Sequence, residues 1–146
     1  MSDFRQLSDR VWASPQITAA DVEAARAKGV TAIVNNRPDG EVEGQPTGGS
    51  IRAAAEAAGL AYHAIPISHS GFSRPQIDAM ASLLEMNEGR VLAYCRSGTR
   101  STFLWALARA SAGEDPARLA DAAAHAGYDV APVRPAMDML AAPDRA

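Results

Sequence analysis

Cysteine is nearly absent from this sequence, since Cys95 is the only one among 146 residues. A single cysteine excludes an internal disulfide framework and a zinc site built from several thiolates, and it fits a reducing compartment. The histidines, at positions 63, 69 and 125, lack the clustered or helical spacing of metal ligands. We therefore expect no metal and no cofactor.

Neither sign of charge dominates the chain. The 14 basic and 17 acidic residues give a formal net charge of −3, so no overall positive field attracts nucleic acid or anionic lipid, and any anion site must be local. No segment approaches the ~20 apolar residues of a membrane span, and residues 1–5 carry no apolar signal region. We expect a cytoplasmic protein with neither a nucleic-acid nor a membrane partner.

Hydrophobic residues make up 47% of the chain and charged residues 21%, which is enough apolar material for a packed core. The length lies within the roughly 100–200 residues of a typical domain. We therefore expect residues 1–146 to form a single domain.

Segments with the apolar pattern of strands are separated by alanine-rich segments with helical spacing. That order is typical of an α/β fold, and we predict a three-layer sandwich with a central, mostly parallel sheet. Thr18, Ser50 and Ser73 are the expected N-caps of the first three helices. The expected strands are residues 4–7, 11–12, 31–35, 60–67 and 91–94, and the expected helices are residues 18–28, 50–59, 74–86, 101–112, 116–126 and 135–140.

Residues 95–101 (CRSGTRS), here called the cradle loop, carry the clearest chemical signal. They connect an apolar strand to a helix, which places Cys95 at a helix N-terminus. The amides after Cys95, aided by the helix dipole, can hold an anion, and the first anion that they stabilise is the nucleophilic thiolate. Gly98 suits so tight a loop, Arg100 can bind an oxyanion through two N–H groups, and Ser101 could hydrogen-bond the sulfur.

The alternative is that Cys95 is a small buried hydrophobe, the usual role of a lone cysteine at the end of a core strand. Packing alone does not require arginines, hydroxyl side chains and a glycine directly after it. The composition of the cradle loop therefore favours a functional cysteine.

The cradle loop, together with residues 33–41 (IVNNRPDGE) and 62–67 (YHAIPI), resembles the phosphatase-like domain of beta-lactamase-hydrolase-like proteins. The resemblance extends over nearly the whole chain. It implies the small α/β fold of the protein tyrosine and dual-specificity phosphatases, with Cys95 at the floor of a pocket. Members of that family are variously described as phosphatases or sulfurtransferases, and some are fused to a persulfide-oxidising partner.

Three features differ from phosphatases of that fold. Four residues separate Cys95 from Arg100, one fewer than in those phosphatases. Tyr94 stands where a histidine commonly precedes the cysteine, and residues 68–71 (SHSG) replace a loop that carries an acidic residue. Phosphoryl transfer to a thiolate requires a proton for the leaving alkoxide, worth roughly 10²–10⁴ in rate, and His69 is the candidate left to supply it.

The spacing Cys-Arg-x-Gly-x-Arg resembles instead the active loop of rhodanese sulfurtransferases, which hold the outer sulfur of a cysteine persulfide with loop amides. Sulfane sulfur transfer releases an anion that is already stable and needs no acid. We expect a cysteine-dependent enzyme, a sulfurtransferase that takes sulfur from thiosulfate or a persulfide onto Cys95 and passes it to an external thiol acceptor.

Two alternatives stay open. The first is a phosphatase that hydrolyses a phosphate ester through a Cys95 thiophosphate while Arg100 clamps the oxygens. The second is a non-catalytic module in which the same loop binds phosphate or sulfate.

Further candidates surround the cradle loop. Arg37, in the loop after strand 31–35, could steer an anionic donor, and Asp39 or Glu41 could orient an arginine of the cradle loop; the alternative is a turn with solvated charges. The catalytic candidates are Cys95 and Arg100, and the substrate-binding candidates are Arg96, Ser97, Gly98, Thr99, Ser101, Arg37 and His69.

Overall fold

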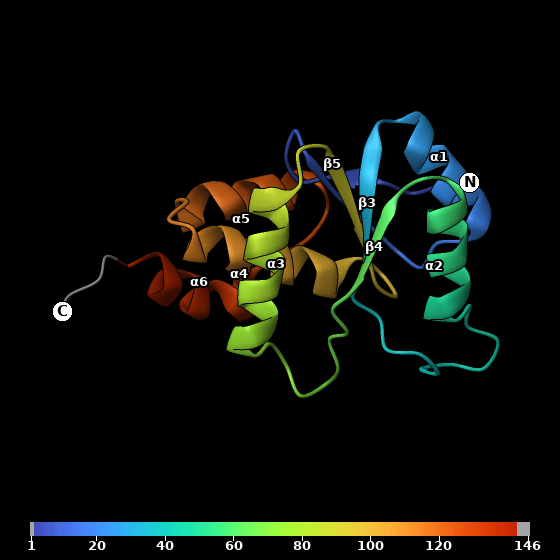
Figure 1. Cartoon of the computed structure of the whole chain (residues 1–146). Coiled ribbons are helices and arrows are strands. Elements are labelled where there is room, and N and C mark those ends of the chain that lie inside the picture. The colour runs from blue at the N-terminus through green and yellow to red at the C-terminus, as the bar shows by residue number, and fades with distance from the viewer. Residues whose placement is uncertain (1, 143–146) are drawn as a thin grey trace.

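The computed structural model describes residues 2–142, in three layers with a central sheet between two sets of helices (Figure 1). The described strands form a five-stranded sheet in the order β1-β2-β5-β3-β4, in which β1 is antiparallel to β2 and the other neighbours are parallel. The predicted α/β class with a mostly parallel sheet is confirmed. The strands are β1 (Arg5–Gln6), β2 (Val11–Ser14), β3 (Val30–Asn35), β4 (Ala61–Ala64) and β5 (Arg90–Tyr94).

Helices α1 (Ala19–Ala27) and α2 (Gly48–Ala57) cover one face of the sheet. Ile33 of β3 and Leu92 of β5 point to this face and belong to one buried cluster with residues of both helices. Their neighbours along the strands point to the opposite face, because side chains alternate in a strand. Both central strands are therefore apolar on both sides, as expected of a parallel sheet covered by helices.

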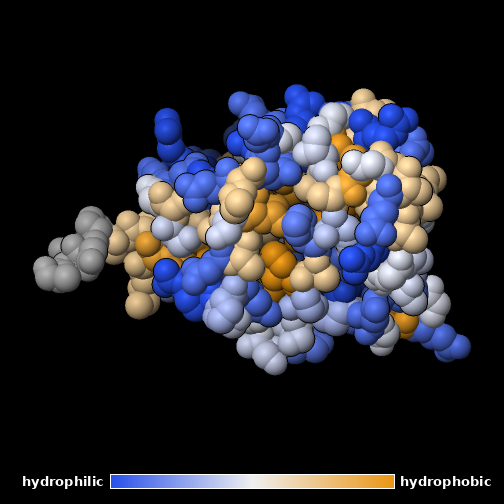
Figure 2. Space-filling model, in the orientation of Figure 1, coloured by the Kyte–Doolittle hydropathy of each residue, from blue (hydrophilic) through white to orange (hydrophobic). Residues whose placement is uncertain are grey.

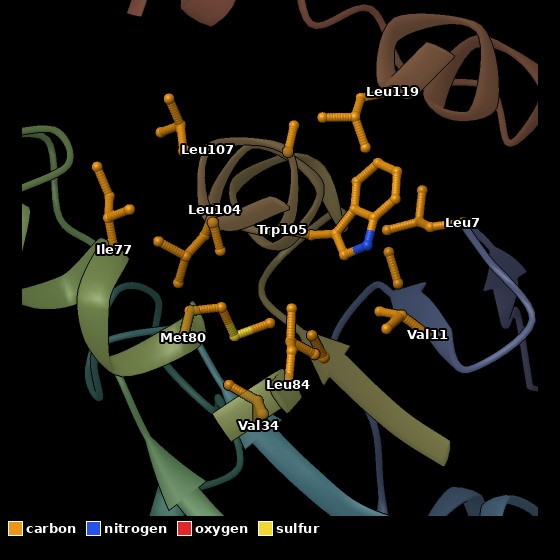
Figure 3. Close-up of a cluster of buried hydrophobic side chains, with 14 of the residues drawn as sticks. Leu7, Val11, Val34, Ile77, Met80, Leu84, Leu104, Trp105, Leu107 and Leu119 are labelled. Atoms are coloured by element: carbon orange, nitrogen blue, oxygen red, sulfur yellow. The ribbon is translucent and has the colours of Figure 1, made fainter. Parts of the chain in front are cut away.

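The other face is covered by α3 (Arg74–Met86), α4 (Thr99–Ser111), α5 (Pro116–His125) and α6 (Arg134–Ala141), with a 3-10 turn at Ala131–Val133. Helix α4 lies at the centre of this layer, and Figure 3 shows Leu104, Trp105 and Leu107 extending from it in different directions among side chains of its neighbours. A helix that is apolar nearly all round is a core helix. Its first turn, residues 99–101, is the end of the cradle loop and is thus anchored by the buried helix that follows.

Most predicted boundaries hold, and the exceptions have local causes. Thr18 and Ser73 cap α1 and α3 in reciprocal capping boxes, as predicted. The predicted cap at Ser50 is wrong, because the Thr47 side chain accepts the Ser50 N–H and α2 already begins at Gly48. Helix α4 likewise begins before residue 101, because Gly98 serves as its N-cap. The predicted strand over 60–67 shortens to β4, followed by Pro66, which has no N–H to donate.

Strand β4 forms an edge of the sheet and is largely exposed, including His63. Figure 2 shows apolar residues gathered at the centre of the same view, between α3 and β4, within a mainly hydrophilic surface. Within residues 2–142, no helix combines the length and the apolar composition needed to cross a membrane.

Strands β3, β4 and β5 run in the same direction, so their carboxyl ends meet at one edge of the sheet, the lower edge in Figure 1. The loop of residues 36–47 leaves β3 there, residues 65–73 leave β4, and the cradle loop leaves β5. In open α/β sheets this edge is where ligands bind.

Candidate active site

Cys95 lies at the carboxyl end of β5, directly before the turn into α4. Its backbone N–H donates to the Ser14 carbonyl oxygen at 3.2 Å, so β2 still holds the chain after β5 ends. The residue is 0% exposed, and its Sγ accepts a hydrogen bond of 3.1 Å from the Gly98 N–H. The burial resembles that of a packed thiol, but the sulfur also accepts a hydrogen bond from a backbone amide, which packing alone does not require.

Gly98 is required by both backbone conformation and space. It is the N-cap of α4 and has a φ of 94°, in the left-handed region that a side chain disfavours. A Cβ at this position would also collide with the hydroxyl of Tyr128. The conformational role follows from the sequence pattern, whereas the contact with Tyr128 does not.

The cradle loop presents several unused backbone donors. Within residues 2–142, the amides of Arg96, Ser97, Arg100 and Ser101 donate to no protein acceptor. The first amides of any helix lack intrahelical partners, and the helix dipole adds positive potential at that end. Together with the Gly98 N–H, these donors can hold an anion bound at Cys95.

The guanidinium of Arg100 is held by a carboxylate and a carbonyl group. Its Nη1 donates to Glu41 Oε2 and to the Ile67 carbonyl oxygen, both at 2.7 Å, and its Nη2 donates to Glu41 Oε1 at 2.8 Å. Hydrogen bonding to Glu41 raises the pKa of Arg100 above its ordinary value, and the nearby Cys95 sulfur raises it further. Arg100 is thus fixed beside Cys95 with three of its N–H bonds in use.

Glu41 joins two arginines. Besides Arg100 it accepts a hydrogen bond from Arg37 Nε at 2.9 Å, while Arg37 Nη1 donates to Gln16 Oε1 at 3.0 Å. Hydrogen bonding to Arg100 first, and to Arg37 as well, lowers the pKa of Glu41 to about 2 despite partial burial. Glu41 is therefore ionised at neutral pH.

These contacts correct the expectations for the loop after β3. Arg37 is buried rather than open to an incoming anion, so its guanidinium supports Glu41 and does not steer a donor from solvent. The alternative, in which Arg37 is a solvated charge in a turn, is also wrong, because the side chain is buried. Asp39 accepts the Gly48 N–H at 2.7 Å at the start of α2, so Glu41 is the carboxylate that orients a cradle arginine.

Ser101 does not donate to the sulfur, contrary to expectation. Its buried hydroxyl donates to Asn36 Oδ1 at 2.8 Å, and Asn36 Nδ2 in turn donates to the Ile65 carbonyl oxygen at 2.9 Å. The Asn36 N–H donates to the Tyr94 carbonyl oxygen at 2.8 Å. This chain of buried hydrogen bonds joins the ends of β3, β4 and β5 to the first turn of α4.

The other candidates are more exposed than Cys95 and Ser101. Arg96 and Ser97 are exposed and Thr99 is half-buried, with the Ser97 hydroxyl donating to Thr99 Oγ1 at 3.0 Å. His69 is exposed in the loop after β4, close in sequence to the Ile67 carbonyl group that holds Arg100. In the described part of the chain, no hydrogen bond joins His69 to the cradle loop.

Three residues in contact with this site escaped the sequence analysis: Gln16, Asn36 and Tyr128. Each is a polar residue far from the cradle loop in sequence, and Tyr128 donates to Ser97 across 31 positions. Of the three, Asn36 carries the clearest sequence signal for a place in the site, because it follows β3 directly at the edge where ligands bind.

The groups around Cys95 suit an anion better than a metal. They are backbone N–H groups and a guanidinium, which donate hydrogen bonds and ligate no cation. Among residues 2–142, no three His, Cys, Asp or Glu side chains are grouped closely enough to hold a metal ion.

A cysteine at the carboxyl end of a parallel strand, followed by a helix N-terminus and an arginine, defines a phosphatase-like scaffold with a cysteine nucleophile. The model of the family "Beta-lactamase hydrolase-like protein, phosphatase-like domain" matches residues 3–112, and the chain belongs to this family. The resemblance inferred from the cradle loop and its flanking motifs is therefore confirmed.

Beta-lactamase hydrolase-like proteins are among the relatives by sequence. That of Xylella fastidiosa (strain Temecula1) is 38% identical over 104 residues, covering 70% of this chain and 24% of the relative. That of Agrobacterium fabrum is 36% identical over 108 residues, covering 74% of this chain and 25% of the relative. The matched part of the chain thus spans about a quarter of the length of these relatives.

Solved structures of phosphatases share the fold. A candidate phosphatase from Neisseria meningitidis is 33% identical with a TM-score of 0.81, covering 93% of this chain and 96% of that chain. Tk-PTP in its active form has a TM-score of 0.72 at 17% identity, with 95% and 96% covered. TpbA of P. aeruginosa, solved with phosphotyrosine, has a TM-score of 0.62 at 21% identity, with 92% and 90% covered.

Proposed function

We propose that this chain is a sulfurtransferase, which moves sulfane sulfur through a persulfide on Cys95. The observation that supports it most is the pairing of Arg100 with an ionised Glu41. The carboxyl group that reaches the cradle loop then carries no proton at neutral pH, because its pKa is about 2. A site so arranged suits a reaction whose leaving group needs no protonation.

In the first half-reaction the Cys95 thiolate attacks the sulfane sulfur of thiosulfate. The new Sγ–S bond forms as the S–S bond of thiosulfate breaks, and the bonding electrons leave with sulfite. The outer sulfur of the Cys95 persulfide keeps a negative charge. The Gly98 N–H, which already donates to Sγ, and the unused amides at 96, 97, 100 and 101 are the donors that hold it.

In the second half-reaction an acceptor thiolate attacks the outer sulfur. The Sγ–S bond breaks, the acceptor leaves as a persulfide and Cys95 returns as a thiolate, so no net electrons are gained or lost. The sequence has no second cysteine, so the acceptor comes from outside this chain. Two exposed residues, Arg96 of the cradle loop and His69 of the loop after β4, are candidates to meet the anionic donor or acceptor.

The same contacts disfavour phosphate ester hydrolysis. A phosphoryl group presents three equatorial oxygens, whereas three N–H bonds of Arg100 are already engaged by Glu41 and Ile67. Cleavage of an ester also releases an alkoxide that must be protonated. The cradle loop, with four residues between Cys95 and Arg100, is also tighter than that of a phosphatase of this fold.

Phosphate ester hydrolysis is the second candidate, favoured by the phosphatases that share the fold. In that reaction Cys95 attacks phosphorus while Arg100 clamps the equatorial oxygens, and the P–O bond to the ester oxygen breaks as the alcohol leaves with a proton from His69 or water. Water then attacks the Cys95 thiophosphate, the S–P bond breaks, and phosphate and the Cys95 thiolate are released. The substrate is then a small phosphate ester. A non-catalytic module that binds sulfate or phosphate through the same donors is the third candidate.

A paired assay separates the three. The assay compares wild type with Cys95→Ser and with a control, His125→Gln, which changes an exposed side chain of α5. Each protein is tested with three substrates: thiosulfate with cyanide, glutathione persulfide with a thiol, and an aryl phosphate. We expect sulfur turnover by wild type and the control, abolished in Cys95→Ser. Turnover of the aryl phosphate alone contradicts the proposal. If wild type shows neither activity but sulfate or phosphate raises its melting temperature, the binding module is favoured.

A further inference from the structure

A single peptide group, between Ser97 and Gly98, is held at both of its ends. Its N–H, that of Gly98, donates to Cys95 Sγ at 3.1 Å. Its carbonyl oxygen, that of Ser97, accepts a hydrogen bond from the Tyr128 hydroxyl, also at 3.1 Å. The orientation of the donor to the sulfur is thus coupled to a side chain on the opposite side of the same peptide plane.

Tyr128 is itself firmly placed. It lies just after α5, its N–H donates to the Ala123 carbonyl oxygen at 2.9 Å, and its side chain belongs to the buried core cluster. The guanidinium of Arg5 lies over its ring at 5.4 Å from the centroid, and Arg5 Nη1 donates to the Ala126 carbonyl oxygen at 3.2 Å. Tyr128 lies outside the segment matched by the family model, which ends at residue 112.

The peptide needs such a restraint because glycine follows it. With no Cβ, Gly98 permits a wider range of backbone rotation than any other residue, and rotation of this peptide would direct its carbonyl oxygen rather than its N–H toward the sulfur. A hydrogen bond accepted by the oxygen opposes that rotation and polarises the N–H at the other end. Burial raises the pKa of Tyr128, so its hydroxyl keeps its proton at neutral pH.

We propose that Tyr128 is a positioning residue that acts through the Ser97–Gly98 peptide to hold the Cys95 sulfur as a reactive thiolate. This inference rests on the nucleophilic role of Cys95 in the proposed function, but not on which group Cys95 transfers. The other groups around the sulfur are Arg100 from α4 and, through Arg100, Glu41 from the loop after β3.

The test is the pH dependence of Cys95 alkylation by iodoacetamide, a reaction that needs no sulfur donor. Tyr128→Phe keeps the ring and removes the hydroxyl. The matched control is Tyr62→Phe, which removes a hydroxyl that accepts from Asn35 on the other face of the sheet. We expect Tyr128→Phe to move the alkylation profile to higher pH. Below the midpoint of the profile alkylation becomes roughly fivefold slower, while the rate at the high-pH plateau stays the same. The profile of Tyr62→Phe does not change.

Two results would overturn the inference. One is a profile of Tyr128→Phe that coincides with that of wild type. The other is faster alkylation at every pH, which would mean that the hydroxyl only closes the loop over the thiol. If Tyr128→Phe does not fold, the test uses a ring-fluorinated tyrosine at position 128 instead. Its hydroxyl is a stronger hydrogen-bond donor, so the alkylation profile is expected to shift to lower pH. An unchanged profile contradicts the proposal.

The same variants separate this inference from the proposed function. A shifted alkylation profile in a protein that transfers no sulfur leaves the role of Tyr128 intact and refutes the sulfurtransferase. Sulfur transfer with an unshifted profile refutes the role of Tyr128 alone.

Discussion

Glu41 and Arg100 form a bidentate ion pair, with Nη1–Oε2 and Nη2–Oε1 distances of 2.7 and 2.8 Å, between the loop after β3 and the first turn of α4. The pair fixes the only cation of the cradle loop that is held beside Cys95. It also keeps the Glu41 carboxylate ionised, which decides the chemistry we propose.

Glu41→Gln is expected to change the acid stability of the fold. The pKa of Glu41 falls from 4.5 to about 2 on folding, so the carboxylate contributes about 3 kcal/mol that is fully present above about pH 4.5 and is lost as the pH falls toward 2. Urea unfolding of wild type and variant at neutral pH and near pH 3 measures it. The wild-type advantage should shrink at the lower pH, and an advantage independent of pH contradicts the assigned ion pair.

Arg100→Lys is expected to lower kcat/KM for sulfur transfer at least about tenfold, because an ammonium cannot reproduce the two parallel hydrogen bonds to Glu41. The control is Arg109→Lys, the same change at an arginine near the other end of α4 that pairs with Glu114. Steady-state kinetics on both variants checks the prediction. Equal activity of the two would show that a positive charge suffices at position 100.

Gly98→Ala is expected to be destabilising for two reasons. The left-handed φ costs of order 1–3 kcal/mol for a residue with a Cβ, and the methyl group meets Tyr128 as well. Gly113→Ala has a similar φ of 100° but open space around the new Cβ, so it isolates the backbone cost. Chemical denaturation should show a larger loss for Gly98→Ala, and equal losses would contradict the close contact with Tyr128.

Lengthening the cradle loop should change its substrate. One glycine inserted between Gly98 and Thr99 gives the loop the length found in phosphatases of this fold. We expect the ratio of aryl phosphate hydrolysis to sulfur transfer to rise, while a glycine inserted after Gly113 leaves it unchanged. A ratio unaffected by the first insertion would mean that loop length does not set the preference.

Much of the fold could be predicted because its signals are local. The caps at Thr18 and Ser73, the apolar strand before Cys95 and the apolar helix after it follow from periodicity and side-chain chemistry within a few residues. The errors arose where two local signals compete. Thr47 and Ser50 are both good N-caps, and the structure uses the earlier one.

The candidate site could be predicted in part. Cys95, Gly98 and Arg100 are close in sequence, and their order alone indicates an anion-binding turn. The roles of Ser101 and Tyr128 depend on partners brought together only by the tertiary fold, Asn36 for the first and the Ser97 carbonyl group for the second. No spacing rule connects such pairs.

The most direct test of the central claim is the mass of the intact protein after incubation with thiosulfate and no acceptor. The account predicts that wild type becomes heavier by one sulfur atom, that Cys95→Ser does not, and that cyanide restores the original mass. An unmodified wild-type mass with thiosulfate, together with a phosphoryl adduct on Cys95 after exposure to an aryl phosphate, would contradict it.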